Sequence, residues 1–328
     1  MTRIRRSPVG GPRRSTWQRA VIMLAAAGFV GACGGAATPS PAPPSVAPPS
    51  STTPSSTTPS PAASIPAGPT SDPSTWTLAW SDEFDGPAAT PPDAATWGYD
   101  LGDGSARGLE GWGNREREYY TDGAANAATD GEGNLLITAR AADGSPECWY
   151  GPCEYTSARL LTKGRFEIQY GRIEARLKVP RGAGLWPAVW MLGASFDEVG
   201  WPKSGEIDVM EYLGRLPNEV FGTIHGPGYS GSSAFGKTLD LGAPLADGFH
   251  EFAIEWQPGR IAWSVDGVVY HEASPADVAP NEWVFDQPFF LILNVAVGGN
   301  LAGPVFPDTV FPASMAVDYV RLYQETTP

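Results

Sequence analysis

Residues 172–179 read Arg-Ile-Glu-Ala-Arg-Leu-Lys-Val, and this stretch indicates the fold class. Its apolar members Ile173, Ala175, Leu177 and Val179 alternate with charged residues. That period of two is typical of a β-strand with one buried face and one solvated face. We therefore expect this segment to lie in a sheet whose inner side packs on a core.

Many other short apolar and aromatic runs, separated by Gly, Pro, Asn and Asp, also predict strands. Residues 74–328 contain no long stretch with the periodicity of a helix. Asp266-Gly267 predicts a hairpin between two of them. Many strands without crossover helices indicate an all-β sandwich of two antiparallel sheets packed face to face. The predicted strands are 76–84, 134–141, 157–161, 165–170, 172–179, 188–192, 206–212, 220–224, 250–256, 260–265, 268–271, 289–297 and 315–323.

The N-terminal segment, residues 1–33, is predicted to be an export signal. It holds six arginines, no acid and an apolar run from Ala20 to Ala32. A membrane span needs roughly 20 apolar residues, so this run is too short to be one. Val30-Gly31-Ala32-Cys33 resembles a bacterial lipobox, which predicts lipidation of Cys33; ordinary cleavage a few residues away is the alternative.

Residues 34–73 consist mainly of Pro, Ser, Thr, Ala and Gly, which predicts a disordered linker. Residues 74–328 are predicted to form the folded domain, with a size normal for one β-sandwich. Without the six arginines of the signal, 16 basic and 36 acidic residues remain, a formal charge of −20. This charge argues against nucleic acid or anionic lipid as a partner, leaving membrane attachment to the lipid anchor. We expect an extracellular or envelope-attached monomer with a neutral substrate.

Cys148 and Cys153 flank a Gly-Pro turn and are the cysteines that follow the signal. In an exported protein they are expected to form a disulfide. The three histidines are scattered along the chain, so we expect no catalytic metal.

The chemistry is expected in the segment Glu206-Ile-Asp-Val-Met-Glu-Tyr212. Strict alternation would place Glu206 and Asp208 on one face and turn Glu211 into the apolar core. Burying an unpaired glutamate there would cost several kcal/mol. One extra residue at Val209-Met210, a β-bulge, would return Glu211 to the acidic face, and bulges are frequent beside active sites.

Three carboxyl groups on one strand face suit a retaining glycosidase, which needs two carboxyl groups about 5–5.5 Å apart. We assign Glu206 as the nucleophile and Glu211 as the general acid/base. Asp208 between them is expected to orient Glu206 and to keep a neighbouring carboxyl protonated. The alternative is an acidic, solvated strand face without catalytic function.

Several stretches resemble glycoside hydrolase family sixteen, in particular its laminarinase-like bacterial branch. They are Tyr155-Thr-Ser-Ala-Arg159-Leu-Leu, Gly184-Leu-Trp186-Pro-Ala-Val-Trp190-Met-Leu-Gly, Trp201-Pro-Lys-Ser-Gly-Glu206-Ile-Asp208-Val-Met-Glu211-Tyr-Leu-Gly, Thr223-Ile-His225-Gly-Pro and Leu293-Asn294-Val-Ala-Val-Gly-Gly. The resemblance implies a concanavalin-like β-jelly-roll with a substrate cleft on its concave sheet. It also implies hydrolysis of internal β-1,3-glucosidic bonds, with mixed-linkage β-1,3-1,4-glucan as a further substrate.

Sugar rings stack on aromatic side chains, and their hydroxyls bind planar amide and guanidinium groups. Among the chain's 12 tryptophans, Trp186, Trp190 and Trp201 are expected to line the cleft, whereas Trp80, Trp256 and Trp263 are expected in the core. The remaining predicted substrate-binding residues are Arg159, Asn126, Asn294 and His225, the last through the resemblance.

The family often carries a structural calcium, and Glu83 and Asp318 occupy matching positions. Three alternatives to a β-1,3-glucanase remain. A galactan hydrolase of the agarase or carrageenase type and a transglycosylase would use the same glutamates. A non-catalytic β-glucan-binding lectin would be expected to lack one or both of them.

Overall fold

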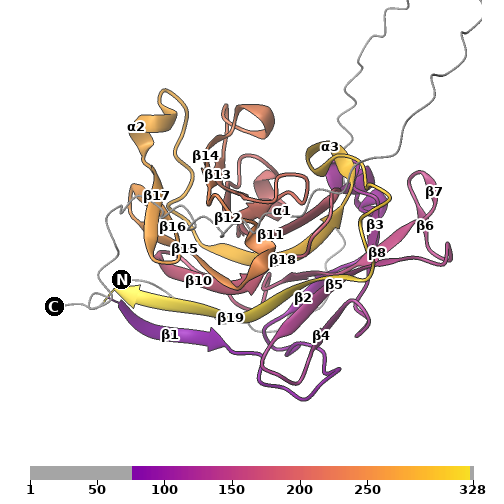
Figure 1. Cartoon of the computed structure of the whole chain (residues 1–328). Coiled ribbons are helices and arrows are strands. Elements are labelled where there is room, and N and C mark those ends of the chain that lie inside the picture. The colour runs from indigo at the N-terminus through magenta and orange to yellow at the C-terminus, as the bar shows by residue number, and fades with distance from the viewer. Residues whose placement is uncertain (1–75, 326–328) are drawn as a thin grey trace, which may run out of the picture. The chain divides into compact units, whose positions relative to one another are not determined.

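The computed structural model describes residues 76–325, which fold as two packed β-sheets (Figure 1). The predicted export signal, the lipidation at Cys33 and the linker at 34–73 lie outside the described residues. No helix in the described part of the chain is long and apolar enough to cross a membrane.

The larger sheet has ten strands in the order β17-β16-β15-β10-β19-β5-β8-β3, with β1 beside β19 and β4 beside β5. Its pairs are antiparallel except β3 with β8, which run parallel. The strands are β1 Trp76–Asp82, β3 Glu118–Tyr120, β4 Ala127–Thr129, β5 Leu135–Ala141, β8 Tyr155–Ser157, β10 Gly171–Lys178, β15 His250–Gln257, β16 Arg260–Val265, β17 Val268–Ala273 and β19 Ala313–Glu325.

The smaller sheet has seven antiparallel strands in the order β14-β13-β12-β11-β18-β9-β2. They are β2 Gly98–Asp100, β9 Arg159–Leu161, β11 Leu185–Gly193, β12 Glu206–Tyr212, β13 Glu219–His225, β14 Phe235–Asp240 and β18 Phe289–Val297. A separate hairpin pairs β6 Glu147–Cys148 with β7 Gly151–Pro152.

Helices are short and lie in the connections between strands. They are α1 Phe196–Val199, α2 Pro275–Val278 and α3 Gly299–Ala302, with 3-10 turns at Ser105–Arg107, Glu110–Gly113, Gly231–Ser233 and Leu245–Asp247. The all-β sandwich predicted from the sequence is therefore confirmed.

One core joins the inner faces of the two sheets. Ile173 and Ile254 of the larger sheet share a cluster of buried side chains with Val189, Ile207 and Leu293 of the smaller one. Figure 1 shows β10 and β19 in one layer and β11, β12 and β18 in the other. Because the inner side of β12 faces this core, its outer side is free to carry polar groups.

The core tryptophans are where the sequence predicted them. Trp256 and Trp263 are fully buried, and Trp80 packs against the same cluster. Tryptophan buried in this way contributes most of its large ring to the core, and its N–H then needs an acceptor. Trp256 donates to the backbone oxygen of Phe285 at 3.0 Å.

Two strand predictions were wrong in detail. Residues 165–170 form no strand; Ile168 makes only an isolated bridge with Phe289. The predicted strand 157–161 is divided at Ala158, so that β8 joins the larger sheet and β9 the smaller. The chain thus crosses between layers here, which a continuous apolar run does not reveal.

The outer face of 172–179 is also less solvated than predicted. Arg172 and Glu174 are both buried, although Ile173 lies on the core side as expected. The Arg172 guanidinium contacts Glu174 at 2.6 Å, Glu251 at 2.9 Å and Glu255 at 3.3 Å. These ion pairs compensate for the loss of water around the charges, which a buried charged side chain needs.

Candidate active site

The carboxylate strand β12 contains the predicted bulge. On β13, Thr223 pairs with Asp208 and Phe221 with Glu211, so two residues of β12 face one residue of its partner. Val209 and Met210 are both buried at this irregularity. The bulge restores the phase of the strand and places the Glu211 side chain on the same side as Glu206 and Asp208, as predicted.

A contact between the two sheets fixes the bulge. The indole N–H of Trp263, on β16, donates to the backbone oxygen of Asp208 at 2.8 Å. Gly222, the residue of β13 opposite the bulge, leaves room for that ring. A Cβ there would lie 2.6 Å from Cδ1 of Trp263 and 2.4 Å from the Tyr270 hydroxyl. The backbone of the catalytic strand is thus held from behind by a buried side chain.

Each of the three carboxyl groups has its own partner. Trp201 donates its indole N–H to Glu206 Oε2 at 2.7 Å, and Trp186 donates to Glu211 Oε1 at 3.0 Å. His225 Nε2 lies 3.1 Å from Asp208 Oδ2 and 3.9 Å from Glu206 Oε1. The structure therefore brings together the predicted catalytic residues, two of the predicted tryptophans and His225.

The tautomer of His225 follows from its second ring nitrogen. Nδ1 accepts a hydrogen bond from the backbone N–H of Gly231 at 3.1 Å, so Nδ1 carries no proton. The proton of the neutral ring is then on Nε2, which faces Asp208 and Glu206. His225 was predicted to contact substrate. In the structure its Nε2 lies beside the carboxyl groups of Asp208 and Glu206.

Burial dominates the electrostatics of the cluster. Burial, and after it the Asp208 charge, raise the pKa of Glu206 to about 8, and burial raises that of Asp208 to about 7. Burial and then Asp208 raise the pKa of Glu211 well above its usual range. His225 and the Trp201 N–H oppose this at Glu206, because both favour its ionised form.

The consequence is that the two glutamates differ in how strongly they hold a proton. Glu211, with its pKa well above the usual range, keeps a proton at neutral pH and can act as an acid. Asp208 supplies the neighbouring negative charge predicted to maintain that state. The pKa of Glu206 is also raised, to about 8, so Glu206 is the glutamate nearer to ionisation, and Trp201 and His225 favour its ionised form.

A second group of predicted residues continues across the sheet from the carboxylates. Trp190 pairs with Asp208 on β12 and with Ile292 on β18, and its indole N–H donates to Asn294 Oδ1 at 2.7 Å. Asn294 pairs with Arg159 on β9. The Arg159 guanidinium lies 4.6 Å from the ring centroid of Trp190. These three predicted substrate-binding residues therefore form one connected cluster, in which Arg159 and Asn294 are buried and Trp190 is partly exposed.

Two further residues complete this cluster, and neither was among the predicted site residues. Trp112 lies on the other side of Arg159, with the guanidinium 4.7 Å from its ring centroid. Asp100 of β2 pairs with Arg159 in the strand register and places Oδ2 3.2 Å from its Nε. The tryptophan content pointed to Trp112, whereas no local sequence signal marked Asp100.

Asn126 is placed differently from the other predicted binding residues. Its amide donates to the Thr138 backbone oxygen at 2.8 Å and to Thr156 Oγ1 at 3.2 Å. Its carbonyl oxygen accepts from Thr121 Oγ1 at 2.7 Å. These bonds join β5 and β8 of the larger sheet, so the structure gives this buried amide a role in tying strands together and does not bring it to the carboxylates.

Each of the two predicted calcium ligands is paired with an arginine. Arg321 binds both oxygens of Glu83, at 2.9 and 2.7 Å, and Arg176 pairs with Asp318. Carboxylates neutralised by arginine offer little to a hard cation, which needs several free oxygen ligands. The residues observed here therefore do not fit the predicted calcium site.

Among the described residues, the group able to offer three ligand atoms to a metal is Glu206, Asp208 and His225, whose ligand atoms lie within 4.8 Å of one another. A cation bound there would occupy the nucleophile.

The predicted disulfide is present. Cys148 and Cys153 are bonded and close the β6–β7 hairpin. The hairpin also places Trp149 so that its indole N–H donates to the Glu116 backbone oxygen at 2.9 Å. The disulfide therefore holds a loop that packs beside β3.

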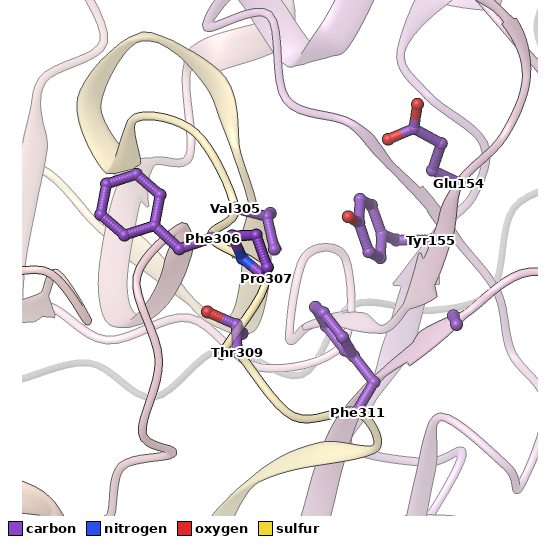
Figure 2. A pocket seen from close by; sticks show the side chains of 8 residues that line it. Glu154, Tyr155, Val305, Phe306, Pro307, Thr309 and Phe311 are labelled. Carbon is purple, nitrogen blue, oxygen red and sulfur yellow. The ribbon is translucent and has the colours of Figure 1, made fainter. Parts of the chain in front are cut away.

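A separate apolar hollow lies away from this chemistry (Figure 2). Tyr155, Val305, Phe306 and Phe311 are among its lining residues, and its volume is about 420 Å³. None of the carboxylates of β12 lines it. This hollow is thus lined by other residues than the acidic cluster.

A β-sandwich with two glutamates and an aspartate on one face of a bulged strand has the carboxyl groups that a glycoside hydrolase uses. The sequence model of glycosyl hydrolases family 16 matches residues 115–320. The chain belongs to this family.

Relatives of known activity agree with this assignment. A β-glucanase of Rhodothermus marinus is 42% identical over 258 residues, which cover 76% of this chain and 85% of the relative. The laminarinase catalytic domain of Thermotoga maritima has a TM-score of 0.73 and 48% identity, covering 77% of this chain and all of that domain. SCLam, described as a non-specific endo-β-1,3(4)-glucanase, has a TM-score of 0.69 and 36% identity, covering 81% of this chain and 98% of that one.

Proposed function

We propose that the protein hydrolyses internal β-1,3-glucosidic bonds of laminarin-type β-glucan and also accepts mixed-linkage β-1,3-1,4-glucan. The observation that carries this proposal is the pairing of each glutamate with a tryptophan N–H on one strand face. The activities of the similar laminarinase and of the non-specific glucanase support the choice of substrate.

The geometry assigns the steps of double displacement to named groups. The Glu206 carboxylate attacks the anomeric carbon, and the glycosidic oxygen leaves with the proton of Glu211. The product is a glycosyl ester on Glu206. Glu211, now ionised, takes a proton from water, whose oxygen attacks the anomeric carbon and releases Glu206. Two inversions retain the β configuration.

Asp208 and His225 act on Glu206 without entering these bonds. While Glu206 is ionised, His225 Nε2 at 3.9 Å and Trp201 at 2.7 Å stabilise its charge. When the glycosyl ester forms, that charge is lost, and Asp208 remains beside it as the negative group facing the developing positive charge of the sugar ring.

The residues around the three carboxyl groups support a galactan hydrolase or a lectin less well than a glucanase. A sulfated galactan would favour a basic surface, but this cleft contains three carboxyl groups, and Arg159 is already paired with Asp100. A lectin has no need of a protonated glutamate opposite a stabilised carboxylate. Transglycosylation uses the same groups and differs only in whether water or a sugar hydroxyl attacks the ester.

The N-terminal expectations lead to a proposal about location. The lipobox-like residues before Cys33 favour attachment of the exported enzyme to the cell envelope, with residues 34–73 as a tether. We propose that it acts as a monomer on extracellular glucan. Labelling with a radioactive fatty acid, compared between the natural chain and Cys33→Ser, tests the attachment.

The activity is tested by incubating the purified protein with laminarin, mixed-linkage glucan and agarose. We expect short β-1,3-linked oligomers from laminarin, whose new reducing ends are first seen as β anomers by NMR. Release of products from agarose alone, or products that begin as α anomers, would contradict the proposal.

A further inference from the structure

A second pair of buried acids lies behind the cleft, at Glu116 and Glu118. Glu118 is on β3 and is fully buried, and Glu116 just before it is 5% exposed. The backbone N–H of Val297, at the end of β18, donates to Glu118 Oε2 at 2.6 Å. The other oxygen, Oε1, is buried without a donor. Burying a charged carboxylate oxygen without a hydrogen-bond donor would cost free energy. If Oε1 of Glu118 is protonated, it can instead donate to the neighbouring Glu116 carboxylate.

A chain of hydrogen bonds leads from this pair to the cleft, and each bond has a fixed direction. Trp190 can only donate, so Asn294 Oδ1 accepts at 2.7 Å. The amide nitrogen of Asn294 then donates to the Tyr120 hydroxyl oxygen at 3.1 Å. Tyr120 must place its own proton elsewhere, and Glu116 Oε2 lies 3.2 Å away.

The last hydrogen bond of this series, from Tyr120 to Glu116, indicates which acid of the pair is charged. Glu116 accepts from Tyr120 with one oxygen and from Asn114 at 3.2 Å with the other, and a carboxylate that accepts on both oxygens suits the ionised member of the pair. Glu118 is then the neutral member and can donate to it. Burial first, and the Glu116 charge second, raise the pKa of Glu118 well above its usual range, in agreement with this direction.

The same groups support the surface where sugar is expected to bind. Tyr120 packs on Trp112 with ring centroids 5.8 Å apart, and Trp112 and Trp190 enclose the Arg159 guanidinium. Trp190 is the strand neighbour of Asp208. A change in the orientation of Trp190 would therefore alter the side-chain surface next to the carboxyl groups of β12.

We propose that Glu118 and Glu116, acting through Tyr120 and Asn294, position Trp190 and Arg159 for binding of a glucan ring beside the catalytic carboxylates. They are positioning residues and touch no substrate. This inference rests on the proposed glucanase function. Its effect should appear in KM, because these residues orient a binding surface and supply nothing to the bond being cleaved.

The experiment measures kcat and KM for a laminari-oligosaccharide with the natural protein, Tyr120→Phe, Glu118→Gln and Glu118→Leu. Phenylalanine keeps the ring but leaves Asn294 without its acceptor, so we expect KM to rise about tenfold and kcat to stay within about twofold. Leucine breaks the pair and should raise KM at least as much. Glutamine can still accept from Val297 and donate to Glu116, so KM should remain within about threefold of the natural value.

A matched control is Tyr99→Phe. The Tyr99 hydroxyl is buried without a hydrogen-bond partner, so its removal should leave KM unchanged. Thermal melting of every variant separates loss of fold from loss of position. A natural protein inactive on the oligosaccharide would refute the glucanase function itself. An active natural protein with an unchanged KM in Tyr120→Phe, or a Glu118→Gln as impaired as Glu118→Leu, would overturn the positioning role.

Discussion

The protein contains two buried acidic clusters that look alike in sequence, but their surroundings differ, and we assign them different roles. Glu206 and Asp208 on β12, like Glu116 and Glu118 at β3, are two residues apart, and burial raises the pKa values of Glu206, Asp208 and Glu118. The β12 pair receives an indole N–H and an imidazole in a cleft. The other pair is sealed behind Tyr120 and bonded to the backbone of Val297.

The difference lies in what can reach each pair. Glu206 has a side chain 17% exposed, enough for a substrate atom to approach, and Glu118 is fully enclosed. A carboxyl group that no substrate can reach can only hold its neighbours in place. Accessibility and the type of donor, more than the number of acids, therefore separate a reacting cluster from a supporting one.

The largest effect should come from Glu206→Gln. The amide cannot attack the anomeric carbon, so we expect kcat/KM on laminarin to fall at least about a thousandfold. The same change at Glu118 should cost at most a few-fold, which sharpens the contrast between the clusters. Reducing-end assays on both variants measure this, and equal losses would mean that the two pairs do not differ as described.

Glu211→Gln should have the next largest effect. It removes the proton that the leaving oxygen needs, so hydrolysis of laminari-oligosaccharides should fall by about 10²–10⁴-fold. An aryl β-glucoside whose phenol leaves without protonation should lose much less in the first step. Stopped-flow detection should then show a burst of phenol followed by slow turnover, since the base for the second step is missing. Equal losses on both substrates would contradict the role of Glu211 as the acid.

Asp208→Asn should change the pH profile more than the rate at the optimum. The Asp208 charge raises the pKa of Glu206 and of Glu211. Without that charge both pKa values fall, and the alkaline limb of kcat/KM, where Glu211 loses its proton, should move to lower pH. Initial rates between pH 4 and 10 measure the shift. An alkaline limb at the natural pH would show that Asp208 does not sustain the protonated acid.

Much of the reacting cluster could be predicted because its evidence is local. The bulge followed from the cost of turning Glu211 into the core, and the pairing on β13 confirms it. The supporting cluster could not be predicted in the same way. Glu118 and Val297 are 179 residues apart, and Tyr120 and Asn294 are 174 apart. Alternating acids near β3 resemble a solvated strand face until the strands that cover them are known.

The same reasoning explains where the sequence misled. Arg172 and Glu174 were predicted to face solvent because charged residues alternated with apolar ones, yet Glu251 and Glu255 from β15 pair with the arginine and help to bury it. Asn126 was predicted to bind sugar because its amide suits hydroxyl groups, yet three threonines occupy that amide. In each case the side chain has the expected chemistry, and a distant strand supplies an internal partner for it.

The smallest effect on activity, that of Glu118→Gln, should be accompanied by a difference in stability from the natural protein that depends on pH. Because the pKa of Glu118 is raised on folding, the folded state holds a proton that the unfolded state releases above its usual pKa near 4.5. That contribution to the free energy of unfolding is present at low pH and is lost as pH rises toward the raised pKa. Glutamine is neutral throughout and carries no such loss. Urea denaturation at pH 5, 7 and 9 should therefore show the variant gaining stability over the natural protein as pH rises, by about 1.4 kcal/mol for each pH unit within that range. A difference that stays constant from pH 5 to pH 9 would mean that Glu118 is ionised in the folded protein, and the assignment of Glu118 as the neutral member of the acid pair would be wrong.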